Sequence, residues 1–359
     1  MFNGKIRVGV IGIGRFSFTN HIPNLRKTGK AEVVAISRRN YQALKDAQKL
    51  LAVPRAYTDW RELLEKEELD AVIISTAHHV LAEPALAALN RGLHVLLEKP
   101  MALTSKDAWS IVRVAEHSSK VLVVGFKERC FGIWRTVKKA LDDGCIGTIR
   151  QINVAYSQGG QFFWEPECLF PQSIQEYLRS QGIPDSFGFY KPLAKDYWRC
   201  NPTERGGGFF ADGGSHKVDL ALWLGGSYPV TVSAIAESDG LPIEHHIVAQ
   251  VKLANGILVS LGSVDGVGEP LQFYSRLTVF GDRGVVDTDG SKIFIKSSNG
   301  LRQLKSGTPD SNTAAEFISG IEGGVIYLTS AQEGAHVVSS IEAAYRSTKE
   351  RRVISIDYP

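Results

Sequence analysis

The segment KIRVGVIGIGRFS, residues 5–17, contains the clearest structural signal in this sequence. Its apolar first half predicts a buried strand, and its second half matches the dinucleotide-binding pattern G-x-G-x-x-G except at the last position. Gly12 allows a tight turn after the strand, and Gly14 allows a pyrophosphate to approach the backbone at a helix N-terminus. Ser17 replaces the third glycine and is small enough for the helix to pack on the strand. The candidate cofactor contacts in this loop are Gly12, Gly14, Arg15, Phe16 and Ser17.

The segments after this loop alternate between apolar runs and helical patterns. Apolar runs at 32–36, 70–75, 94–98 and 121–126 predict further strands, and the segments between them have the spacing of helices. Strands that are apolar throughout and alternate with helices are typical of a parallel sheet covered on both faces. We therefore predict a doubly wound α/β domain of the Rossmann type over residues 1–127.

The end of the second predicted strand indicates which nicotinamide cofactor this domain prefers. An NAD enzyme carries Asp or Glu there for the ribose 2′-hydroxyl, whereas this chain has Ser37, Arg38 and Arg39. Serine and arginine can hydrogen-bond a 2′-phosphate and neutralise its charge, while a carboxylate would repel it. The sequence therefore predicts a preference for NADP(H), with NAD(H) possible. The alternative is that both arginines are solvated surface charge.

Composition excludes several other classes of protein. The formal net charge is only +3, and the basic residues are scattered rather than gathered in a stripe, so we expect no nucleic-acid partner. No apolar run reaches membrane-spanning length, and the start runs into a strand pattern without a signal-type apolar core. We expect a cytoplasmic protein with free thiols and no metal site. The four cysteines, which lack metal-binding or disulfide-type spacing, are Cys130, Cys145, Cys168 and Cys200.

The remainder of the chain, residues 128–359, has a different pattern. Stretches with period-two alternation dominate, separated by turns such as ANG and GDRG. They predict a substrate-binding and oligomerisation domain of the α+β class, with a large, mostly antiparallel open sheet and helices on one face. An irregular insert at 161–198 holds ten aromatic residues in 38 positions. Trp164 and Tyr190 of this insert are candidate contacts to the apolar face of a sugar ring, and a buried loop or an interface is the alternative.

A second glycine cluster, GGGFFADGGSHKVD at 206–219, carries groups that can move protons. Asp212 and His216 are four residues apart, which places them on one face if the segment is helical. A carboxylate beside an imidazole fixes its tautomer and raises its basicity. A histidine of that kind can remove the hydroxyl proton when a carbinol loses hydride, and can return it in the reverse direction.

Two motifs resemble those of the glucose–fructose oxidoreductase and inositol dehydrogenase (Gfo/Idh/MocA) family. LLEKPMALT at 96–104 is similar to the first, and the cluster at 206–219 is similar to the second, G-G-G-x-x-x-D-x-G-x-H-x-x-D. The resemblance covers nearly the whole chain. It implies that Lys99, Asp212 and His216 form the catalytic and substrate-contacting group. It does not say whether Lys99 or His216 carries the proton.

The resemblance also implies contacts to the nicotinamide side of the cofactor. After the fourth strand this chain reads STAHHVLAE, where relatives usually have Thr-Pro-Asn and a histidine three residues later. Ala77, His78 and Leu81 are the departures from that pattern. His78 or His79 is expected to border the nicotinamide, and the alternative is polar filler at a strand end. Relatives often carry Trp-Arg before the triple glycine, as here. The candidate cofactor contacts outside the glycine loop and Ser37–Arg39 are Thr76, His78, Glu98, Lys99, Trp198 and Arg199.

Taken together, these observations predict an NADP(H)-dependent oxidoreductase that interconverts a hydroxyl and a carbonyl on a sugar, sugar derivative or cyclitol by hydride transfer. One alternative is redox-assisted glycoside processing with a bound nicotinamide cofactor. Another is a non-catalytic, cofactor-sensing regulator, against which the intact Lys99, Asp212 and His216 argue. By resemblance we expect a homo-oligomer, a dimer or a tetramer.

Overall fold

The computed structural model describes residues 4–158, 169–192, 194, 197–240, 243–265 and 273–359. The chain divides into two compact units, which are described separately. Unit 1 comprises Met1–Gly125, Phe162–Arg205 and Asn312–Ala331, and unit 2 comprises Phe126–Gln161, Gly206–Ser311 and Gln332–Pro359. The aromatic insert thus groups with the first unit, although the sequence places it within the second domain. The domain limits of 1–127 and 128–359 stay a prediction.

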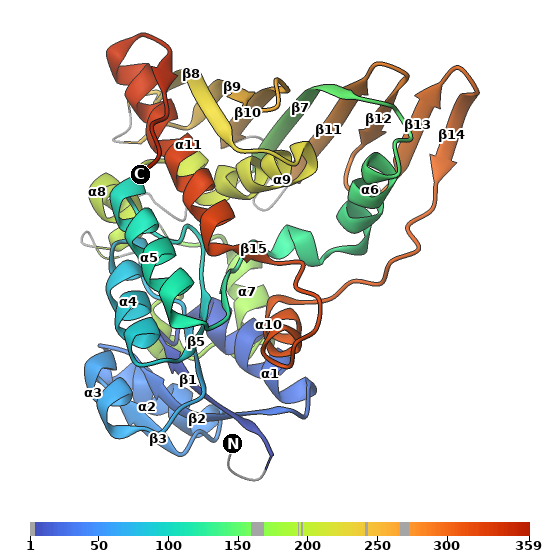
Figure 1. Cartoon of the computed structure of the whole chain (residues 1–359). Helices are drawn as coiled ribbons and strands as arrows, with labels where there is room; N and C mark the ends of the chain where they lie inside the picture. The colour runs from blue at the N-terminus through green and yellow to red at the C-terminus, as the bar shows by residue number, and fades with distance from the viewer. Residues whose placement is uncertain (1–3, 159–168, 193, 195–196, 241–242, 266–272) are drawn as a thin grey trace. The chain divides into compact units, whose positions relative to one another are not determined.

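Unit 1 is built on a doubly wound sheet, which confirms the predicted fold class (Figure 1). Over the described residues the strand order is β15-β6-β5-β4-β1-β2-β3, and all neighbours are parallel except β15, which runs antiparallel to β6. The central strands β1, β4 and β5 are buried almost throughout, as expected for a sheet covered on both faces. The strands are β1 (Ile6–Ile11), β2 (Ala31–Ser37), β3 (Arg55–Tyr57), β4 (Ala71–Ile74), β5 (His94–Leu97), β6 (Leu122–Val124) and β15 (Thr329–Ser330).

Helices of unit 1 lie on both faces of this sheet (Figure 1). Several begin at a side chain that accepts a hydrogen bond from the first turn: Asn40 caps α2, Thr104 caps α5 and Asn312 caps α10. The aromatic insert, predicted to be irregular, contains the helix α7 in its described part. The helices are α1 (Ile22–Lys27), α2 (Tyr41–Leu50), α3 (Trp60–Lys66), α4 (Ala82–Asn90), α5 (Ser105–Ser118), α7 (Gln172–Ser180), α8 (Pro202–Arg205) and α10 (Thr313–Ile321).

Unit 2 contains the predicted large open sheet. Over the described residues its order is β14-β13-β12-β11-β7-β10-β9-β8-β16, and only the β10–β7 pair is parallel. Burial alternates along β9 and β10, so one face is covered and the other is open. The strands are β7 (Ile149–Gln158), β8 (Pro229–Glu237), β9 (His246–Leu253), β10 (Leu258–Asp265), β11 (Phe273–Gly281), β12 (Gly284–Thr288), β13 (Ile293–Ser297), β14 (Gly300–Leu304) and β16 (Ile354–Ser355).

Three helices pack on the covered face of this sheet: α6 (Gly132–Asp142), α9 (Ser215–Gly225) and α11 (Ala331–Glu350) (Figure 1). The approach is close, because the backbone N–H of Ala234 in β8 donates to Ser347 Oγ in α11 at 3.0 Å. A Cβ on Gly225 of α9 would come within 2.7 Å of Leu253 in β9. The helix that follows the second glycine cluster is therefore seated firmly on the sheet.

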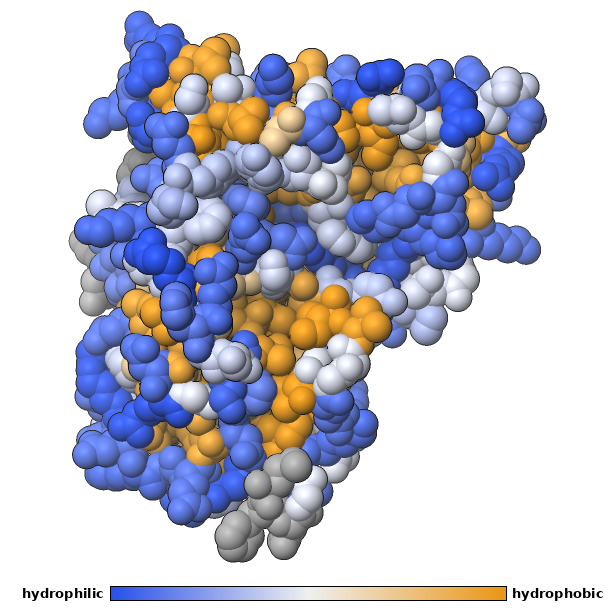
Figure 2. Space-filling model, in the orientation of Figure 1, coloured by the Kyte–Doolittle hydropathy of each residue, from blue (hydrophilic) through white to orange (hydrophobic). Residues whose placement is uncertain are grey.

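The face of the protein that Figure 2 shows carries both polar and apolar residues. Figure 2 shows polar and charged residues over most of the visible face of each unit, with apolar residues in smaller groups between them. Among the residues described, none of the helices combines the length and the apolar character that crossing a lipid bilayer requires.

Candidate active site

The glycine loop of unit 1 follows β1 directly and is tied to the end of β2. The N–H groups of Gly12 and Ile13 donate to the carbonyl oxygen of Ser37 at 3.0 and 2.9 Å. Ser17 is fully buried, and its hydroxyl donates to the carbonyl oxygen of Gly12 at 3.2 Å. The serine at the third glycine position thus holds the loop from the helix side, and the loop and the end of β2 form one rigid piece.

The two glycines of the loop are constrained for different reasons. Gly12 has φ +88, and a Cβ there would lie 2.6 Å from the carbonyl oxygen of Ser75. A Cβ on Gly14 would meet no protein atom within 4 Å. The chain itself therefore requires glycine at position 12, whereas the space in front of position 14 is open. A dinucleotide pyrophosphate at the start of the following helix would fill that space.

Replacing Gly14 with alanine should weaken dinucleotide binding about tenfold or more, because the new methyl group occupies the approach path of the pyrophosphate. The fold should tolerate the change, and the unfolding temperature should stay level or rise slightly. Calorimetric titration with NADPH and thermal unfolding measure the two effects. Gly12→Ala is the matched control, since it should lower the unfolding temperature itself. Unchanged NADPH affinity in Gly14→Ala would contradict the assignment.

The carboxyl ends of the parallel strands bring other predicted residues to the same edge of unit 1. Backbone bonds continue the strand ladder past the strand ends, from Ser75 N to Ile11 O at 2.8 Å and from Glu98 N to Ile74 O at 2.9 Å. The segments that carry Thr76, His78 and Lys99 therefore leave the sheet at the edge where the glycine loop opens. That edge is the ligand-binding edge of doubly wound sheets.

Glu98 positions the backbone of Lys99. Its Oε1 lies 2.9 Å from His21 Nε2, and its Oε2 accepts from the N–H of Lys99 at 3.3 Å. A Cβ on Gly125 would lie 2.7 Å from the same carboxylate, so the strand beside it leaves room for Glu98. His21 is fully buried, and its other ring nitrogen lies 3.5 Å from the hydroxyl of Thr313. Glu98, predicted as a cofactor contact, is thus engaged with the protein.

His21 is a residue that the sequence analysis missed. It lies on the helix that starts at the glycine loop, and its ring packs edge-to-face against Phe16 with centroids 4.9 Å apart. Its spacing from Ser17 could have predicted its burial. His21 lies one helical turn after Ser17, so it is on the same face of the helix, which is turned toward the sheet.

His78 is brought together with the end of the aromatic insert. It is buried, its Nδ1 lies 2.8 Å from the carbonyl oxygen of Arg205, and its ring centroid lies 4.6 Å from that of Trp198. A carbonyl oxygen only accepts, so Nδ1 of His78 is the donor in this hydrogen bond. Arg199 stacks on Trp198, with its guanidinium carbon 4.4 Å from the ring. Three predicted cofactor residues therefore meet in unit 1.

The three residues at the end of β2, Ser37 to Arg39, differ in their exposure to solvent. Ser37 is buried, Arg39 is exposed, and Arg38 lies between these extremes. Nη1 of Arg38 donates to the carbonyl oxygen of Ile13 in the glycine loop at 2.6 Å. Burial lowers the pKa of the Arg38 guanidinium, which the nearby Tyr197 partly offsets. Arg38 is thus a partly desolvated cation beside the candidate phosphate loop, whereas Arg39 is a solvated one.

The two candidate sugar-contacting aromatics have different outcomes. Trp164 lies outside the described residues. The hydroxyl of Tyr190 donates to the carbonyl oxygen of Ile183 at 2.9 Å, and the guanidinium carbon of Arg179 lies 4.3 Å from its ring. These contacts hold the Tyr190 side chain in place inside the insert.

In unit 2, Asp212 and His216 belong to one continuous helical segment. It opens with a wide turn at Phe210–Gly214 and continues as α9. Asp212 is buried, and the His216 ring meets Phe126 edge-to-face with centroids 5.6 Å apart. Burial, followed by the charges of Glu128 and Asp212, raises the pKa of the Tyr156 phenol. Both predicted proton-handling groups are therefore held on a rigid element of unit 2, with a phenol close to Asp212.

Tyr345 and Glu244 contact the triple glycine before this helix so closely that larger residues would not fit. Tyr345 Oη accepts from the N–H groups of Gly208 and Ala211, each at 3.1 Å, and donates to Glu244 Oε1 at 2.9 Å. Gly207 has φ +124, and a Cβ there would lie 2.4 Å from the Tyr345 ring. A Cβ on Gly208 would lie 2.0 Å from Glu244 Oε2. Contacts inside unit 2 therefore require glycine at positions 207 and 208.

Two further side chains of α9 form ion pairs. Asp219 receives two hydrogen bonds from Arg129, at 2.9 and 2.7 Å, and both side chains are almost fully buried. Lys217 pairs with Glu128 at 2.7 Å. Removing one partner of such a buried pair leaves an uncompensated charge, so these residues fix the helix that carries His216.

Among the described residues, Cys130, Cys145 and Cys200 are not joined in disulfides, and Cys168 lies outside the described residues. Within the described part of the chain, no group of three or more His, Cys, Asp or Glu side chains is arranged to hold a metal ion.

Two segments of the chain match models of known protein families. Residues 6–126 match the family model described as "Oxidoreductase family, NAD-binding Rossmann fold", and residues 184–287 match the "GFO/IDH/MocA C-terminal domain". The chain belongs to the GFO/IDH/MocA family. This family member is a nicotinamide-dependent oxidoreductase of the sugar dehydrogenase type.

Individual relatives of this GFO/IDH/MocA protein are distant in sequence and similar in fold. Myo-inositol 2-dehydrogenase of Thermotoga maritima is 24% identical over 98% of this chain and 99% of its own length. Levoglucosan dehydrogenase, solved with NADH and levoglucosan, has a TM-score of 0.80 at 19% identity and covers 99% of this chain and 100% of its own. The WlbA dehydrogenase of Bordetella pertussis, solved with NADH and UDP-GlcNAcA, has a TM-score of 0.76 at 25% identity, with 99% and 100% covered.

Proposed function

We propose that this protein is an NADP(H)-dependent oxidoreductase that interconverts a hydroxyl and a carbonyl on a sugar, sugar derivative or cyclitol. The observation that carries the proposal is the placement of Lys99. Its backbone is held by Glu98 at the ligand-binding edge of the unit 1 sheet, where the glycine loop also opens. A lysine whose backbone is held at that edge can bring its ammonium group to an oxygen whose negative charge grows during the reaction.

The chain offers a fitting place for the dinucleotide. The open space before Gly14 and the helix start behind it suit a pyrophosphate, and Arg38 lies beside the loop to meet a 2′-phosphate. When bound, the nicotinamide gives or takes the hydride. His78, Trp198 and Arg199 meet in the same unit and would contact the cofactor toward its nicotinamide side.

Proton transfer is assigned to Lys99, Asp212 and His216 together. Lys99 donates a hydrogen bond to the reacting oxygen and brings positive charge to it. His216 takes the hydroxyl proton in oxidation and returns it in reduction, because an imidazole can do both near neutral pH. Asp212 orients the imidazole and supports its charged form. An arrangement in which Lys99 itself carries the proton uses the same three residues.

The substrate class is inferred from chemistry and from relatives. A sugar or cyclitol presents several hydroxyl groups, which these three side chains can bind, and C–H faces, which aromatic side chains of the insert can cover. Trp164 and Tyr190 are the proposed aromatic contacts. The relatives named above include dehydrogenases of myo-inositol and levoglucosan, which supports a cyclic polyol substrate.

A screen of NADP⁺ reduction over pyranoses, cyclitols, keto-sugars and short 2-hydroxy acids tests this function. We expect turnover of at least one cyclic sugar or polyol with net formation of NADPH. Glycoside cleavage without net NADPH formation would instead establish the redox-assisted alternative. Faster turnover of 2-hydroxy acids than of any cyclic substrate would overturn the proposed substrate class.

We also propose that the protein is a homo-oligomer that assembles through the open face of the unit 2 sheet. Directly opposed residues share a face, and the ladder aligns Ile235, Val248, Gly262, Ala155 and Arg276 in one row across five strands. Ile235 in β8 and Val248 in β9 are 76% and 54% exposed, which is unusual for large apolar side chains that lie next to each other.

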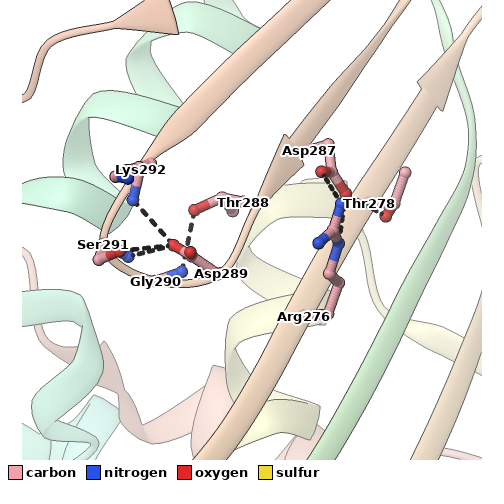
Figure 3. A network of polar contacts seen from close by, with 8 residues as sticks. All are labelled: Arg276, Thr278, Asp287, Thr288, Asp289, Gly290, Ser291 and Lys292. Carbon is pink, nitrogen blue, oxygen red and sulfur yellow. Dashed lines mark hydrogen bonds and ion pairs between the residues drawn. The ribbon is translucent and has the colours of Figure 1, made fainter.

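The same face carries an ordered polar group. Arg276 donates to Asp287, and the hydroxyl of Thr278 donates to the same carboxylate at 2.8 Å, on the neighbouring strands β11 and β12 (Figure 3). Beside them Asp289 accepts three hydrogen bonds in the turn between β12 and β13, which lowers the pKa of its carboxyl to about 2. Apolar residues beside a fixed polar network suit a specific interface between copies.

Light scattering should therefore give a mass of at least two chains, and Val248→Asp should shift the protein toward the monomer. Leu50→Asp, at a 58% exposed position on α2 of unit 1, is the matched control and should leave the mass unchanged. A monomeric wild-type protein at micromolar concentration would contradict the assembly.

A further inference from the structure

Phe187 lies in the aromatic insert, far from the glycine loop in the sequence. Its ring nevertheless contacts side chains that lie next to that loop. It ends the short turn Asp185–Phe187 and is 7% exposed. The guanidinium carbon of Arg38 lies 4.2 Å from its ring centroid. Phe18, on the helix that follows the glycine loop, meets the same ring edge-to-face with centroids 5.6 Å apart. Phe187 thus packs at the junction between the loop helix and the end of β2.

Arg38 is held by this ring and by the glycine loop together. Its Nη1 donates to the carbonyl oxygen of Ile13, while its flat face lies over Phe187. A long, charged side chain at a strand end normally samples many rotamers, and stacking on an aromatic ring restricts them. Arg38 is therefore fixed in position before any ligand arrives.

The guanidinium of Arg38 is only partly exposed to solvent. Its Nε is buried and has no hydrogen-bond partner among the described residues, so the chain balances the charge incompletely. Burial also lowers the pKa of this guanidinium, as expected for a poorly solvated cation. Such a cation gains most from a strong anionic acceptor.

We propose that Phe187 is a specificity-determining positioning residue, which holds the Arg38 guanidinium where it selects a dinucleotide that carries a 2′-phosphate. This inference rests on the proposed NADP(H) preference and names the residue that makes Arg38 effective. The insert, predicted to serve the sugar, thereby acts on cofactor choice through one of its aromatic residues.

A second aromatic pair in the same insert shows that not every ring there has this role. Phe170 and Phe189 stack on each other with centroids 5.5 Å apart and an interplanar angle of 29°. Phe189 lies only two residues from Phe187, so Phe189→Leu is a matched control for the loss of an insert aromatic without loss of the Arg38 contact.

The test measures dissociation constants for NADPH and NADH separately, by nucleotide fluorescence, on the full-length protein. Phe187→Leu should weaken NADPH binding about tenfold and NADH binding less than about twofold, because only the 2′-phosphate uses the held guanidinium. Phe187→Tyr should retain the wild-type ratio of the two constants, since the ring is kept. Phe189→Leu should also retain it.

A double-mutant cycle identifies the route of the effect. In an Arg38→Leu background, Phe187→Leu should cause no further change in NADPH affinity, because its partner is already absent. If Phe187→Leu fails to fold, as judged by thermal unfolding, Phe187→Met is measured in the same cycle.

Each of the following outcomes would overturn the proposal. Equal weakening of both nucleotides in Phe187→Leu would show that the ring only supports the fold. An unchanged ratio, or a loss that persists in full without Arg38, would show that it does not act through Arg38. Wild-type protein that binds NADH at least as tightly as NADPH would overturn the cofactor preference, and this proposal with it. Wild-type NADPH preference with an unchanged ratio in Phe187→Leu would overturn the role of Phe187 alone.

Discussion

Replacing Lys99 with methionine should lower the turnover number about a hundredfold or more and leave NADPH binding nearly intact. The substitution keeps the length of the side chain and removes the charge and the donor that stabilise the reacting oxygen. The fold should persist, because the hydrogen bond to Glu98 comes from the backbone N–H of residue 99, which methionine retains. Steady-state kinetics with the best substrate from the screen, together with fluorescence titration of NADPH, separate the two effects.

His216→Ala should lower turnover by a comparable factor, and Asp212→Asn should fall between His216→Ala and the wild type, since it removes only the orienting charge. Lys106→Met, at an exposed position of unit 1, is the matched control and should have no effect. Full turnover in His216→Ala would move proton transfer to Lys99. Full turnover in Lys99→Met would contradict the proposed site.

Replacing Arg38 with aspartate should weaken NADPH binding about a hundredfold, because a charge-assisted contact to the 2′-phosphate becomes a repulsion. NADH binding should change far less, since aspartate at the end of the second strand is what NAD enzymes use for the ribose hydroxyl. The ratio of dissociation constants for the two nucleotides reports the change directly.

Arg39→Asp provides the comparison for this result. Arg39 is exposed, so salt and water screen its charge, and its replacement should weaken NADPH binding less than that of Arg38. Equal loss of NADPH and NADH affinity in Arg38→Asp would show that Arg38 only supports the glycine loop through Ile13.

Much of unit 1 was predictable because its signals are local. The apolar strands β1, β4, β5 and β6 and the glycine loop are each encoded in a few consecutive residues. The edge strands β3 and β15 lack that signal. They have three and two residues, which is too few to show a periodic pattern of apolar residues.

Residues that act through long-range contacts could not be predicted. Tyr345 and Glu244 clamp the triple glycine from distant parts of the sequence, and no local pattern links them. Phe187 was counted among the aromatic residues of the insert. Its packing on Arg38 depends on the tertiary structure, which brings the insert next to the end of β2. Lys99, Asp212 and His216 were named as catalytic candidates because two motifs resemble those of the GFO/IDH/MocA family, and their role stays a prediction.

The antiparallel strand β15 has a consequence for the order in which the protein is made. Its partner β6 leaves the ribosome about 200 residues earlier, and Thr329 and Ser330 are the residues that pair with Val124 and Val123. At a synthesis rate of about 5–20 residues per second, the nascent sheet waits roughly 10–40 seconds with that edge open. An unpaired edge of apolar residues is a template for aberrant association, so this interval is when the growing chain most needs a chaperone.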